Sequence, residues 1–571
     1  MPDSDNLNSK LTELKIQQGE EVAKQTAQKL SLNYINLILA PINSEALLII
    51  PQNTSQEAQI IVFQKENNQI AVGCINPHNP ATQEVIANLQ KKYQVKVFLI
   101  SPHSFQYAQS LYPKIKVSTT SITGQINLSP TIITEFQKKI NSIDKLKEEI
   151  QKNSQEKSNI LELLEISLAG ALQINASDIH LEAQENQAIL RYRIDGLLHQ
   201  IYSFPLQIHQ LLSQRIKLLA GMKINLKDIA QDGRFTIKIQ DEEIEVRVSS
   251  IPGNYGDSIV MRILDPKTIA LKLENLGLRN DLYQITRQEI QQPNGMIITT
   301  GPTGSGKTTL LYAILKKKYS PEIKIITLEN PIEYHLAGIT QTQIKETDFE
   351  GESSLSSLEK KYPGRKKEYT FASGLRAILR QDPDVILVGE IRDKETAQTA
   401  IQAALTGHLV LSTIHTNDAA GAILRLVNFE IDPATIATAL RLIIAQRLVR
   451  KTCPYCRKPS TPTQTEIEKI KKAVENLPPN LKPEIENLTL YHGSGCDKCN
   501  YTGYKGRTGI FELIPITPSI EKIITTNPTH YQIRQQAIQE GMITMYQDGI
   551  LKVIKGITTL EEIERVSGDI H

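Results

Sequence analysis

The feature that most constrains the fold of this chain is a short glycine-rich loop between an apolar strand and a helix. Residues 301–308 are Gly-Pro-Thr-Gly-Ser-Gly-Lys-Thr, which fits the pattern G-x-x-x-x-G-K-[ST]. Met296–Thr299 before the loop predicts a strand, and Thr309–Lys317 after it predicts a helix. The glycines let backbone N–H groups turn toward phosphates, and the helix N-terminus favours anions. We expect Lys307 to reach the β- and γ-phosphates and Thr308 to bind Mg²⁺. The residues expected to contact the nucleotide are Gly301, Pro302, Thr303, Gly304, Ser305, Gly306, Lys307, Thr308 and Thr309.

Two further segments place acidic residues at the ends of predicted strands. Asp384–Glu390 contains four consecutive apolar residues, which is typical of a buried parallel strand, and it ends in Glu390. Another strand, Ile323–Ile326, is followed by Glu329 and Glu333. Ligands bind at the carboxyl edge of a parallel sheet. We therefore expect Glu390 to hold Mg²⁺ through water, and one of the other two glutamates to orient and deprotonate an attacking water.

A fourth segment, Gly407–Asn417, carries His408 and His415 on either side of a predicted strand. An isolated histidine is more often structural. Two histidines that bracket a strand next to a phosphate site instead suggest a sensor of the γ-phosphate, and His415 is the candidate.

Four of the five cysteines form two C-x-x-C pairs, Cys453 with Cys456 and Cys496 with Cys499. Two such pairs supply the four thiolates of a tetrahedral Zn²⁺ site. In a reducing compartment, metal binding is favoured over disulfides. The alternatives are two unrelated knuckles, or a degenerate site that folds without metal. Cys74 is left over and is predicted to be a small buried apolar residue.

Composition excludes several classes of protein. The 571 residues carry 64 basic and 62 acidic side chains, for a net charge of +2, so no nucleic-acid footprint dominates the chain. No run approaches the ~18 apolar residues that span a bilayer. Met1–Lys10 has no apolar signal core. We therefore expect a cytosolic protein whose membrane association is indirect.

Four regions follow from the pattern along the chain. Residues 1–115 alternate helix and strand signals and contain no catalytic cluster, so we expect a small mixed α/β docking domain. Residues 116–157 are predicted to be a helical linker, 158–268 an α+β domain, and 269–571 an α/β core with a mostly parallel sheet and a module at 451–515.

Within the linker, apolar residues at steps of three and four predict an amphipathic helix or a short coiled coil, and a solvated linker helix is the favoured interpretation. These residues are Ile133, Phe136, Ile140, Ile143, Leu146 and Ile150. Lys345–Glu368 is polar and charged, and it predicts a mobile loop.

Together these segments resemble the ATPases of type II secretion and type IV pilus assembly (GspE/PilB-like). The resemblance rests first on the phosphate loop, on TLENPIE at 327–333, on VGEIRD at 388–393 and on GHLVLSTIHTNDA at 407–419, in that order. It extends to further segments on both sides: Ala176–Glu182, Arg191–Gly196, Gln231–Arg234, Ala445–Arg450, Gly503–Gly509 and Glu540–Met542. It implies a RecA-like P-loop ATPase core, preceded by an α+β domain and followed by a tetracysteine zinc module.

The resemblance also implies residue roles. Glu333 matches the family's catalytic glutamate, and Glu390 its magnesium-side glutamate. Arg234, Arg247 and Arg262 lie where the family places arginines that reach the nucleotide across domains or subunits, and a fixed guanidinium charge suits a transferring phosphoryl group. Arg247 and Arg234 rank above Arg262, and each could instead be an ordinary surface arginine of a strand.

The sequence departs from the family pattern in three places. Asn330 stands where the family usually has Asp, which predicts tuned rather than lost activity. The segment Lys345–Glu368 is longer than usual. The N-terminal region lacks an evident Arg-Leu-Gly signature, so a cyclic dinucleotide ligand is not predicted.

The implied function is that of a homo-hexameric motor, peripheral to the inner membrane on its cytoplasmic side, which hydrolyses ATP with Mg²⁺. Its implied partners are an inner-membrane platform protein and a cytoplasmic adaptor, and sequence-specific nucleic-acid binding is not expected. One alternative is a DNA-uptake (competence) ATPase. A retraction motor is disfavoured by the cysteine module and the N-terminal domain. A non-hydrolysing nucleotide-binding scaffold is supported only by Asn330.

Overall fold

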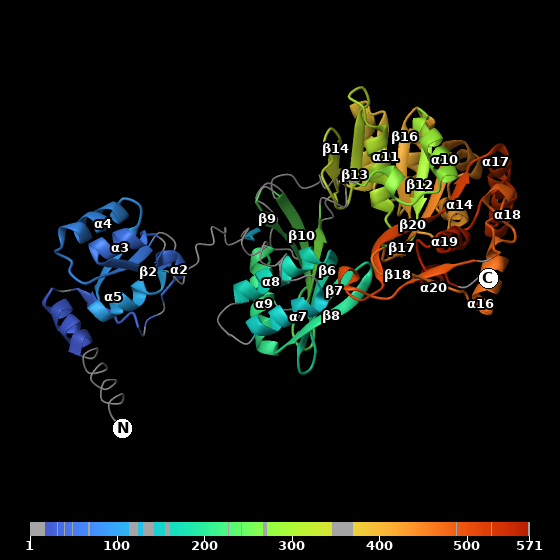
Figure 1. Cartoon of the computed structure of the whole chain (residues 1–571). Coiled ribbons are helices and arrows are strands. Elements are labelled where there is room, and N and C mark those ends of the chain that lie inside the picture. The colour runs from blue at the N-terminus through green and yellow to red at the C-terminus, as the bar shows by residue number, and fades with distance from the viewer. Residues whose placement is uncertain are drawn as a thin grey trace. The chain divides into compact units, whose positions relative to one another are not determined.

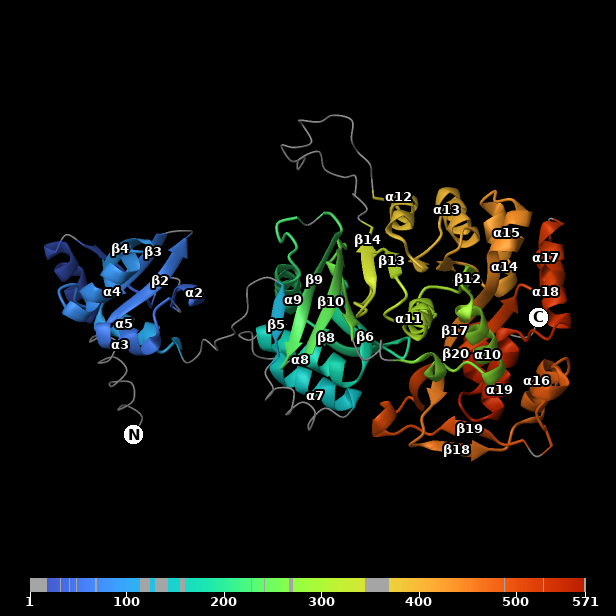
Figure 2. The same ribbon diagram turned by 90° about the horizontal axis from the view of Figure 1, so that it is seen from above.

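The computed structural model divides the chain into two units, residues 1–120 and 121–571, which are described separately (Figures 1 and 2). The residues that the structure describes are 18–112, 124–128, 142–154 and 160–568, except 31, 39, 41, 48, 67–68, 227, 241, 266–270, 345–368, 487 and 527. The predicted loop Lys345–Glu368 and three positions of the predicted amphipathic helix (Ile133, Phe136 and Ile140) lie outside them.

The N-terminal unit is a mixed α/β fold, as predicted. A helix over residues 18–29 is followed by β1 (Asn33–Tyr34), α2 (Ser44–Leu47), α3 (Gln52–Ala58), β2 (Ile60–Glu66), β3 (Gln69–Cys74), α4 (Pro80–Gln90), β4 (Gln94–Leu99) and α5 (Pro102–Gln109). The sheet order is β1-β4-β3-β2, and only the β2–β3 pair is antiparallel among the described strands.

Helices cover both faces of this first sheet. Successive side chains of a strand point to opposite faces. Ile61 and Phe63 accordingly pack with α5, while Ile60 and Val62 pack with α3 and α4. Cys74 is fully buried, as predicted, and burial raises the pKa of its thiol to about 11.

The second unit begins with a largely antiparallel sheet. Its elements are β5 (Gln125–Asn127), α7 (Ile143–Ser154), α8 (Ile160–Gln173), β6 (Ala176–Ala183), β7 (Ala188–Ile194), β8 (Leu197–Phe204), α9 (Leu206–Leu219), β9 (Gln231–Ile239), β10 (Glu242–Ile251) and β11 (Ser258–Leu264). The strand order is β5-β9-β10-β11-β6-β7-β8. Alternate residues of β7 (Leu190, Tyr192 and Ile194) are buried in one core with α8 and α9, which gives the predicted α+β layer (Figure 2).

Helix α7 is part of this core. Ile143, Leu146 and Ile150 are at most 8 % exposed and belong to the same apolar cluster as α8. A Cβ added at Gly170 of α8 would lie 2.3 Å from a methyl group of Leu146, so the two helices approach closely. The interpretation as a solvated linker is therefore wrong for α7, because its apolar stripe is covered by the domain that follows.

The following α/β domain carries the phosphate loop. Its elements are η3 (Leu273–Asn275), α10 (Asn280–Gln291), β12 (Gly295–Thr300), α11 (Lys307–Lys318), β13 (Ile325–Glu329), β14 (Thr340–Gln343), α12 (Phe371–Ile378), η4 (Leu379–Gln381), β15 (Val385–Val388), α13 (Lys394–Leu405), β16 (Leu409–Ile414), α14 (Ala419–Asn428), α15 (Pro433–Ala439), β17 (Leu440–Thr452) and β20 (Tyr504–Pro515). The strand order is β14-β13-β15-β16-β12-β17-β20, and every pair except β17–β20 is parallel. Strands β12, β13, β15 and β16 are buried along their full length, so helices cover both faces, as predicted (Figure 1).

The rest of the chain is a two-stranded module and a group of helices. These elements are β18 (Arg457–Ser460), α16 (Gln464–Val474), η5 (Pro479–Leu481), β19 (Leu490–Gly493), η6 (Asp497–Cys499), α17 (Pro518–Thr525), α18 (His530–Gln539), α19 (Met545–Ile554) and α20 (Leu560–Ser567). Of the helices in the described ranges, none has both the length and the apolar character needed to cross a membrane.

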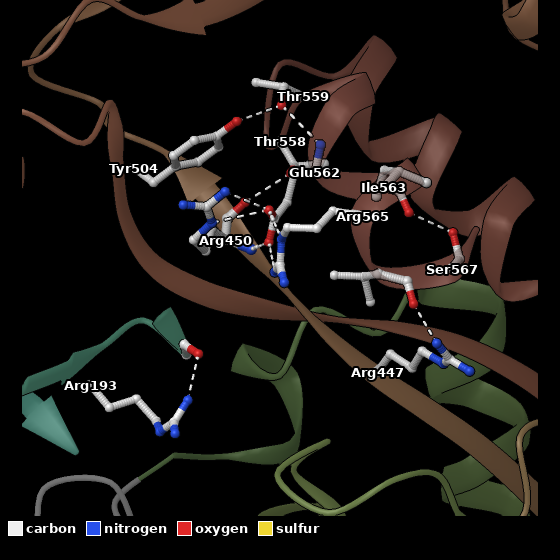
Figure 3. A network of polar contacts seen from close by, with 12 residues as sticks. Arg193, Arg447, Arg450, Tyr504, Thr558, Thr559, Glu562, Ile563, Arg565 and Ser567 are labelled. Carbon is white, nitrogen blue, oxygen red and sulfur yellow. Dashed lines mark hydrogen bonds and ion pairs between the residues drawn. The ribbon is translucent and has the colours of Figure 1, made fainter. Parts of the chain in front are cut away.

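A buried carboxylate ties α20 to the main sheet (Figure 3). Glu562 has a fully buried side chain, and it accepts hydrogen bonds from Arg450 of β17 and from Arg565. The Arg450 guanidinium also lies 4.0 Å from the ring centroid of Tyr504 on β20. Burial opposes ionisation, but these hydrogen bonds hold the pKa of Glu562 below its ordinary value. Two of the segments singled out in the sequence, at 445–450 and 503–509, therefore meet in one structural cluster.

Candidate active site

The loop between β12 and α11 has a backbone that only glycine fits comfortably. The φ angles of Gly301, Gly304 and Gly306 are 144°, 78° and 91°. A Cβ at Gly301 would lie 2.4 Å from the backbone oxygen of Gln446 on β17, and a Cβ at Gly306 would lie 2.8 Å from its Nε2. The loop is therefore packed directly against β17, which leaves no room for larger residues at these positions.

Lys307 is buried at the start of α11, and its ammonium turns back over the loop. Its Nζ donates to the carbonyl oxygens of Gly301 at 2.7 Å and Pro302 at 3.0 Å. An ammonium has three N–H donors, so one remains for a phosphate oxygen. Burial lowers the pKa of Lys307, while the nearby Glu390 carboxylate opposes that shift. Thr308 follows at the exposed helix N-terminus, where its hydroxyl oxygen suits Mg²⁺.

Glu390 and His415 follow the carboxyl ends of the adjacent strands β15 and β16. The Glu390 Oε2 lies 3.5 Å from His415 Nε2, and its Oε1 lies 2.5 Å from Arg392 Nη2. Burial and the Lys307 charge lower the pKa of His415, so its imidazole is neutral near pH 7. Lys307, Glu390 and His415 thus gather at one edge of the sheet.

His408 lies elsewhere. It precedes β16, and its Nδ1 is 3.0 Å from the carbonyl oxygen of Ala403 in α13. Because Gly295 pairs with Leu409 at the starts of β12 and β16, the phosphate loop is at the opposite end of these strands. Of the two histidines that bracket β16, His415 therefore lies at the phosphate end, whereas His408 caps the end of α13.

The two glutamates after β13 have different environments. The Glu329 side chain is 3 % exposed, and its carboxylate accepts from Tyr312 Oη at 2.5 Å and from Thr327 Oγ1 at 2.6 Å. The Glu333 side chain is 29 % exposed, and its Oε2 lies 2.8 Å from Arg247 Nη1. Glu329 is therefore occupied within the fold, whereas Glu333 is accessible to a small reactant.

The three candidate arginines form one row across the preceding sheet. Arg247 on β10 is paired in register with Arg234 on β9 and with Arg262 on β11. Arg247 also donates to the carbonyl oxygen of Ile332, next to Glu333. Arg262 lies 3.0 Å from Asp178, and Arg234 is exposed with no side-chain partner among the described residues. Of the three, Arg247 is the one that contacts the loop bearing Glu333.

The four cysteines come together as a single cluster. Their sulfur atoms all lie within 4.8 Å of one another. The closest pairs are Cys456–Cys499 and Cys496–Cys499 at 3.7 Å and Cys453–Cys496 at 3.9 Å. A tetrahedral ion with Zn–S bonds of about 2.3 Å requires S–S separations of about 3.8 Å, whereas a disulfide requires about 2 Å. The donor set and its spacing therefore fit Zn²⁺.

Three residues of the site were not predicted from the sequence: Tyr312, Gln341 and Arg392. Tyr312 lies within an apolar helical run and Gln341 on a short polar strand, so neither position has a motif. Arg392 lies in the segment VGEIRD two residues after Glu390, and this position was the signal that could have indicated the contact. All three contact an acidic residue of the candidate site.

Comparison with known proteins places this site in a family. A family model described as "Type II/IV secretion system protein" matches residues 153–565. The chain belongs to this family. A second model, the MshEN domain, matches residues 30–117 of this secretion ATPase.

Two curated relatives cover most of its length. Type II secretion system protein E of Dickeya dadantii is 39 % identical over 529 residues, which span 92 % of this chain and 99 % of the relative. Type IV pilus assembly ATPase PilB of Myxococcus xanthus is 32 % identical over 531 residues, with coverage of 93 % and 88 %. Among solved structures, the ATPase DotB of Legionella pneumophila matches with 20 % identity and a TM-score of 0.49, covering 71 % of this chain and 95 % of that one. The predicted family, α/β fold and ATPase class are confirmed.

Proposed function

We propose that this secretion ATPase is a hexameric motor that powers type II protein secretion or type IV pilus assembly from the cytoplasmic face of the inner membrane, with Glu333 as its general base. The observation that carries the proposal is the Glu333–Arg247 contact of 2.8 Å, at the carboxyl edge of the sheet that bears the phosphate loop. The names of its relatives support both machines, since one belongs to type II secretion and another to pilus assembly.

In the proposed reaction, water attacks the γ-phosphorus of ATP, and ADP leaves. Glu333 orients this water and accepts its proton, because its carboxylate is accessible while that of Glu329 is occupied. Lys307 binds the β- and γ-phosphates. The hydroxyl of Thr308 and the carboxylate of Glu390, through water, are the oxygen donors that fit Mg²⁺, which neutralises phosphate charge when bound. His415, neutral beside Glu390, senses the γ-phosphate in this proposal.

Arg247 links hydrolysis to the position of the preceding domain. It comes from β10 of another sheet, yet it contacts the loop of the proposed base. When ATP is bound, the more highly charged γ-phosphate competes with Glu333 for the guanidinium. Arg234, exposed beside it, is available to a nucleotide in the same subunit or in a neighbouring one. A nucleotide site that an arginine of a neighbouring subunit can reach favours a ring of identical subunits.

The remaining parts serve attachment in this proposal. The four clustered cysteines bind Zn²⁺ and stabilise the loops around η6. Residues 1–115 dock on an inner-membrane platform protein or its cytoplasmic adaptor, so that membrane association is indirect.

The test compares the full-length protein with Glu333→Gln. The variant is expected to bind ATP normally and to lose single-turnover phosphate release by at least about 100-fold. Glu322→Gln is the matched control, because Glu322 is exposed and precedes the start of β13, whereas Glu333 follows its end. Hydrolysis by Glu333→Gln at the wild-type rate would exclude the assigned base. Full specific activity in a strictly monomeric protein would exclude the ring.

A further inference from the structure

A buried tyrosine connects the phosphate-loop helix to the loop that carries the proposed base. Tyr312 is 3 % exposed, and its Oη donates to the Glu329 carboxylate at 2.5 Å. It lies five residues after Lys307 in α11. At a rise of about 1.5 Å per residue, the two positions are only about 7.5 Å apart along one helix. The residue that binds phosphate and the residue that contacts Glu329 therefore move as one rigid element.

The same hydroxyl also reaches the backbone next to the proposed base. The backbone N–H groups of Glu333 and Tyr334 lie near enough to the Tyr312 oxygen to lower the pKa of its hydroxyl. Burial and the Glu329 charge nevertheless raise the pKa of Tyr312, so its hydroxyl stays protonated and can donate to Glu329 throughout the physiological range. One hydroxyl group thus donates to Glu329 at the end of β13 and lies beside the backbone of the Glu333 loop.

Gln341 of β14 holds the other side of this loop. Its Nε2 donates to Glu329 at 3.2 Å and to the carbonyl oxygen of Tyr334 at 2.9 Å. Its Oε1 accepts the backbone N–H of Leu336 at 2.7 Å. Glu329 is therefore the shared anchor of two side chains that fix the backbone on both sides of Tyr334.

We propose that Tyr312 is a positioning residue for ATP hydrolysis, which sets the place of Glu333 relative to the phosphate loop through its contacts with Glu329 and with the backbone of the Glu333 loop. This inference rests on the proposed role of Glu333 as the base. Because Tyr312 is buried and its hydroxyl donates to Glu329, its role in this proposal is exerted through the Glu333 loop. Its effect is on the distance between the base and the γ-phosphate, to which rates are sensitive at the level of about 1 Å.

The test is a double-mutant cycle on the full-length protein, measured by single-turnover hydrolysis of ATP. Tyr312→Phe keeps the buried ring and removes only the bridging hydroxyl. We expect kcat to fall about tenfold while KM and nucleotide affinity change less than twofold. In the Glu333→Gln background, the same substitution is expected to reduce the residual rate by less than twofold, because the base that Tyr312 positions is already absent.

Each arm of the cycle separates this inference from its premise. If Glu333→Gln hydrolyses ATP normally, the proposed base is wrong. If Glu333→Gln is inactive but Tyr312→Phe turns over at the wild-type rate, the positioning role alone is overturned. An equal loss from Tyr312→Phe in both backgrounds also overturns it, since a purely structural defect would act independently of Glu333.

Two further variants serve as a control and as a replacement for Tyr312→Phe. Tyr319→Phe makes the same chemical change just beyond the end of α11, at a side chain that is 41 % exposed, and it should leave kcat unchanged. If Tyr312→Phe loses nucleotide binding or its cooperative thermal unfolding, Gln341→Met replaces it in the cycle, because it removes the second anchor with little change in volume. The same tenfold loss, confined to the background with Glu333, is expected, and a loss in both backgrounds refutes the proposal.

Discussion

Replacing Arg247 by alanine removes the guanidinium that joins β10 to the loop of Glu333. Two unit charges 2.8 Å apart attract by about 6 kcal/mol at an effective dielectric constant of about 20. The two side chains are 22 % and 29 % exposed, so solvent reduces the net value to the order of 1 kcal/mol. A bound γ-phosphate carries more charge than one carboxylate, and we therefore expect it to draw Arg247 away from Glu333.

The expected effect of Arg247→Ala falls on turnover rather than on binding. Loss of a guanidinium from the transferring phosphoryl group should lower kcat by about 100- to 1,000-fold, or about 3–4 kcal/mol. ATP affinity should change less than about fivefold. The variant loses a contact with phosphate, but ATP binding no longer has to break the Arg247–Glu333 ion pair, and the two effects offset each other. Arg247→Lys should restore little of the lost kcat. The Arg247 guanidinium contacts both Glu333 and the Ile332 carbonyl, and a lysine ammonium cannot reproduce these two contacts.

Steady-state phosphate release and the affinity for a fluorescent ATP analogue measure these two effects separately. Lys238→Ala is the control, because Lys238 on β9 pairs with Glu243 on β10 at the surface and contacts no residue assigned to the site among those described. A kcat of Arg247→Ala within twofold of the wild-type value would refute the reasoning. A large loss of affinity with unchanged kcat would refute it as well, since Arg247 would then act on the ground state.

Four other outcomes follow from the structure. Glu562→Ala leaves two arginines without their buried partner and should lower the free energy of unfolding by about 3 kcal/mol, measured as faster hydrogen exchange in α20. Folding lowers the pKa of Glu562 below its ordinary 4.5, so its contribution to stability is present at neutral pH and is lost as the pH falls through the folded pKa. Elemental analysis should find about one zinc per chain, strongly reduced in Cys456→Ser and unchanged in Cys74→Ala. The pKa of His415 is lowered from 6.5, so its titration should not affect activity above pH 6.5. At lower pH the ring becomes charged beside Lys307, and activity should fall. This fall at acid pH should be absent from the pH–rate profile of His415→Asn. Removing residues 1–120 should preserve basal hydrolysis and abolish recruitment to membranes that contain the platform protein, whereas equal binding of the intact chain to plain anionic vesicles would contradict docking through a partner.

The sequence was sufficient to predict the parallel core because its strands are continuous apolar runs that end in polar residues. Asp384–Glu390 is such a run, and β15 with Glu390 beyond its end is what the structure contains. The paired cysteines were equally informative, because four thiols in two close pairs have few uses outside metal binding. These features are local, so spacing alone reveals them.

Other features depended on contacts between distant segments. Spacing could not distinguish Glu329 from Glu333, because the difference is that Tyr312 and Thr327 occupy one carboxylate and not the other. The sequence placed His408 and His415 on either side of a strand, but only the contacts show that His408 binds the end of α13. The apolar stripe of α7 is the same whether it faces solvent, a partner or α8, and only the packing shows that it faces α8.

The nucleotide site is assembled from parts that are held in different ways, and this difference bears on how a motor could work. Lys307 and Tyr312 share one helix, and Tyr312 contacts Glu329, so the phosphate loop and the loop of the base are fixed within one sheet. Arg247 comes from another sheet and contacts the base through a partly exposed ion pair of low net strength. A ligand can shift the equilibrium between two conformations of a protein only through contacts that differ between those conformations. In the proposed mechanism, Arg247 is the contact that ATP changes, because the arginine exchanges Glu333 for a phosphate while the Tyr312 anchor stays in place. We therefore expect hydrolysis and release of phosphate to return the arginine to Glu333, so that the free energy of each exchange is available to shift the sheet of β10 relative to the ATPase core.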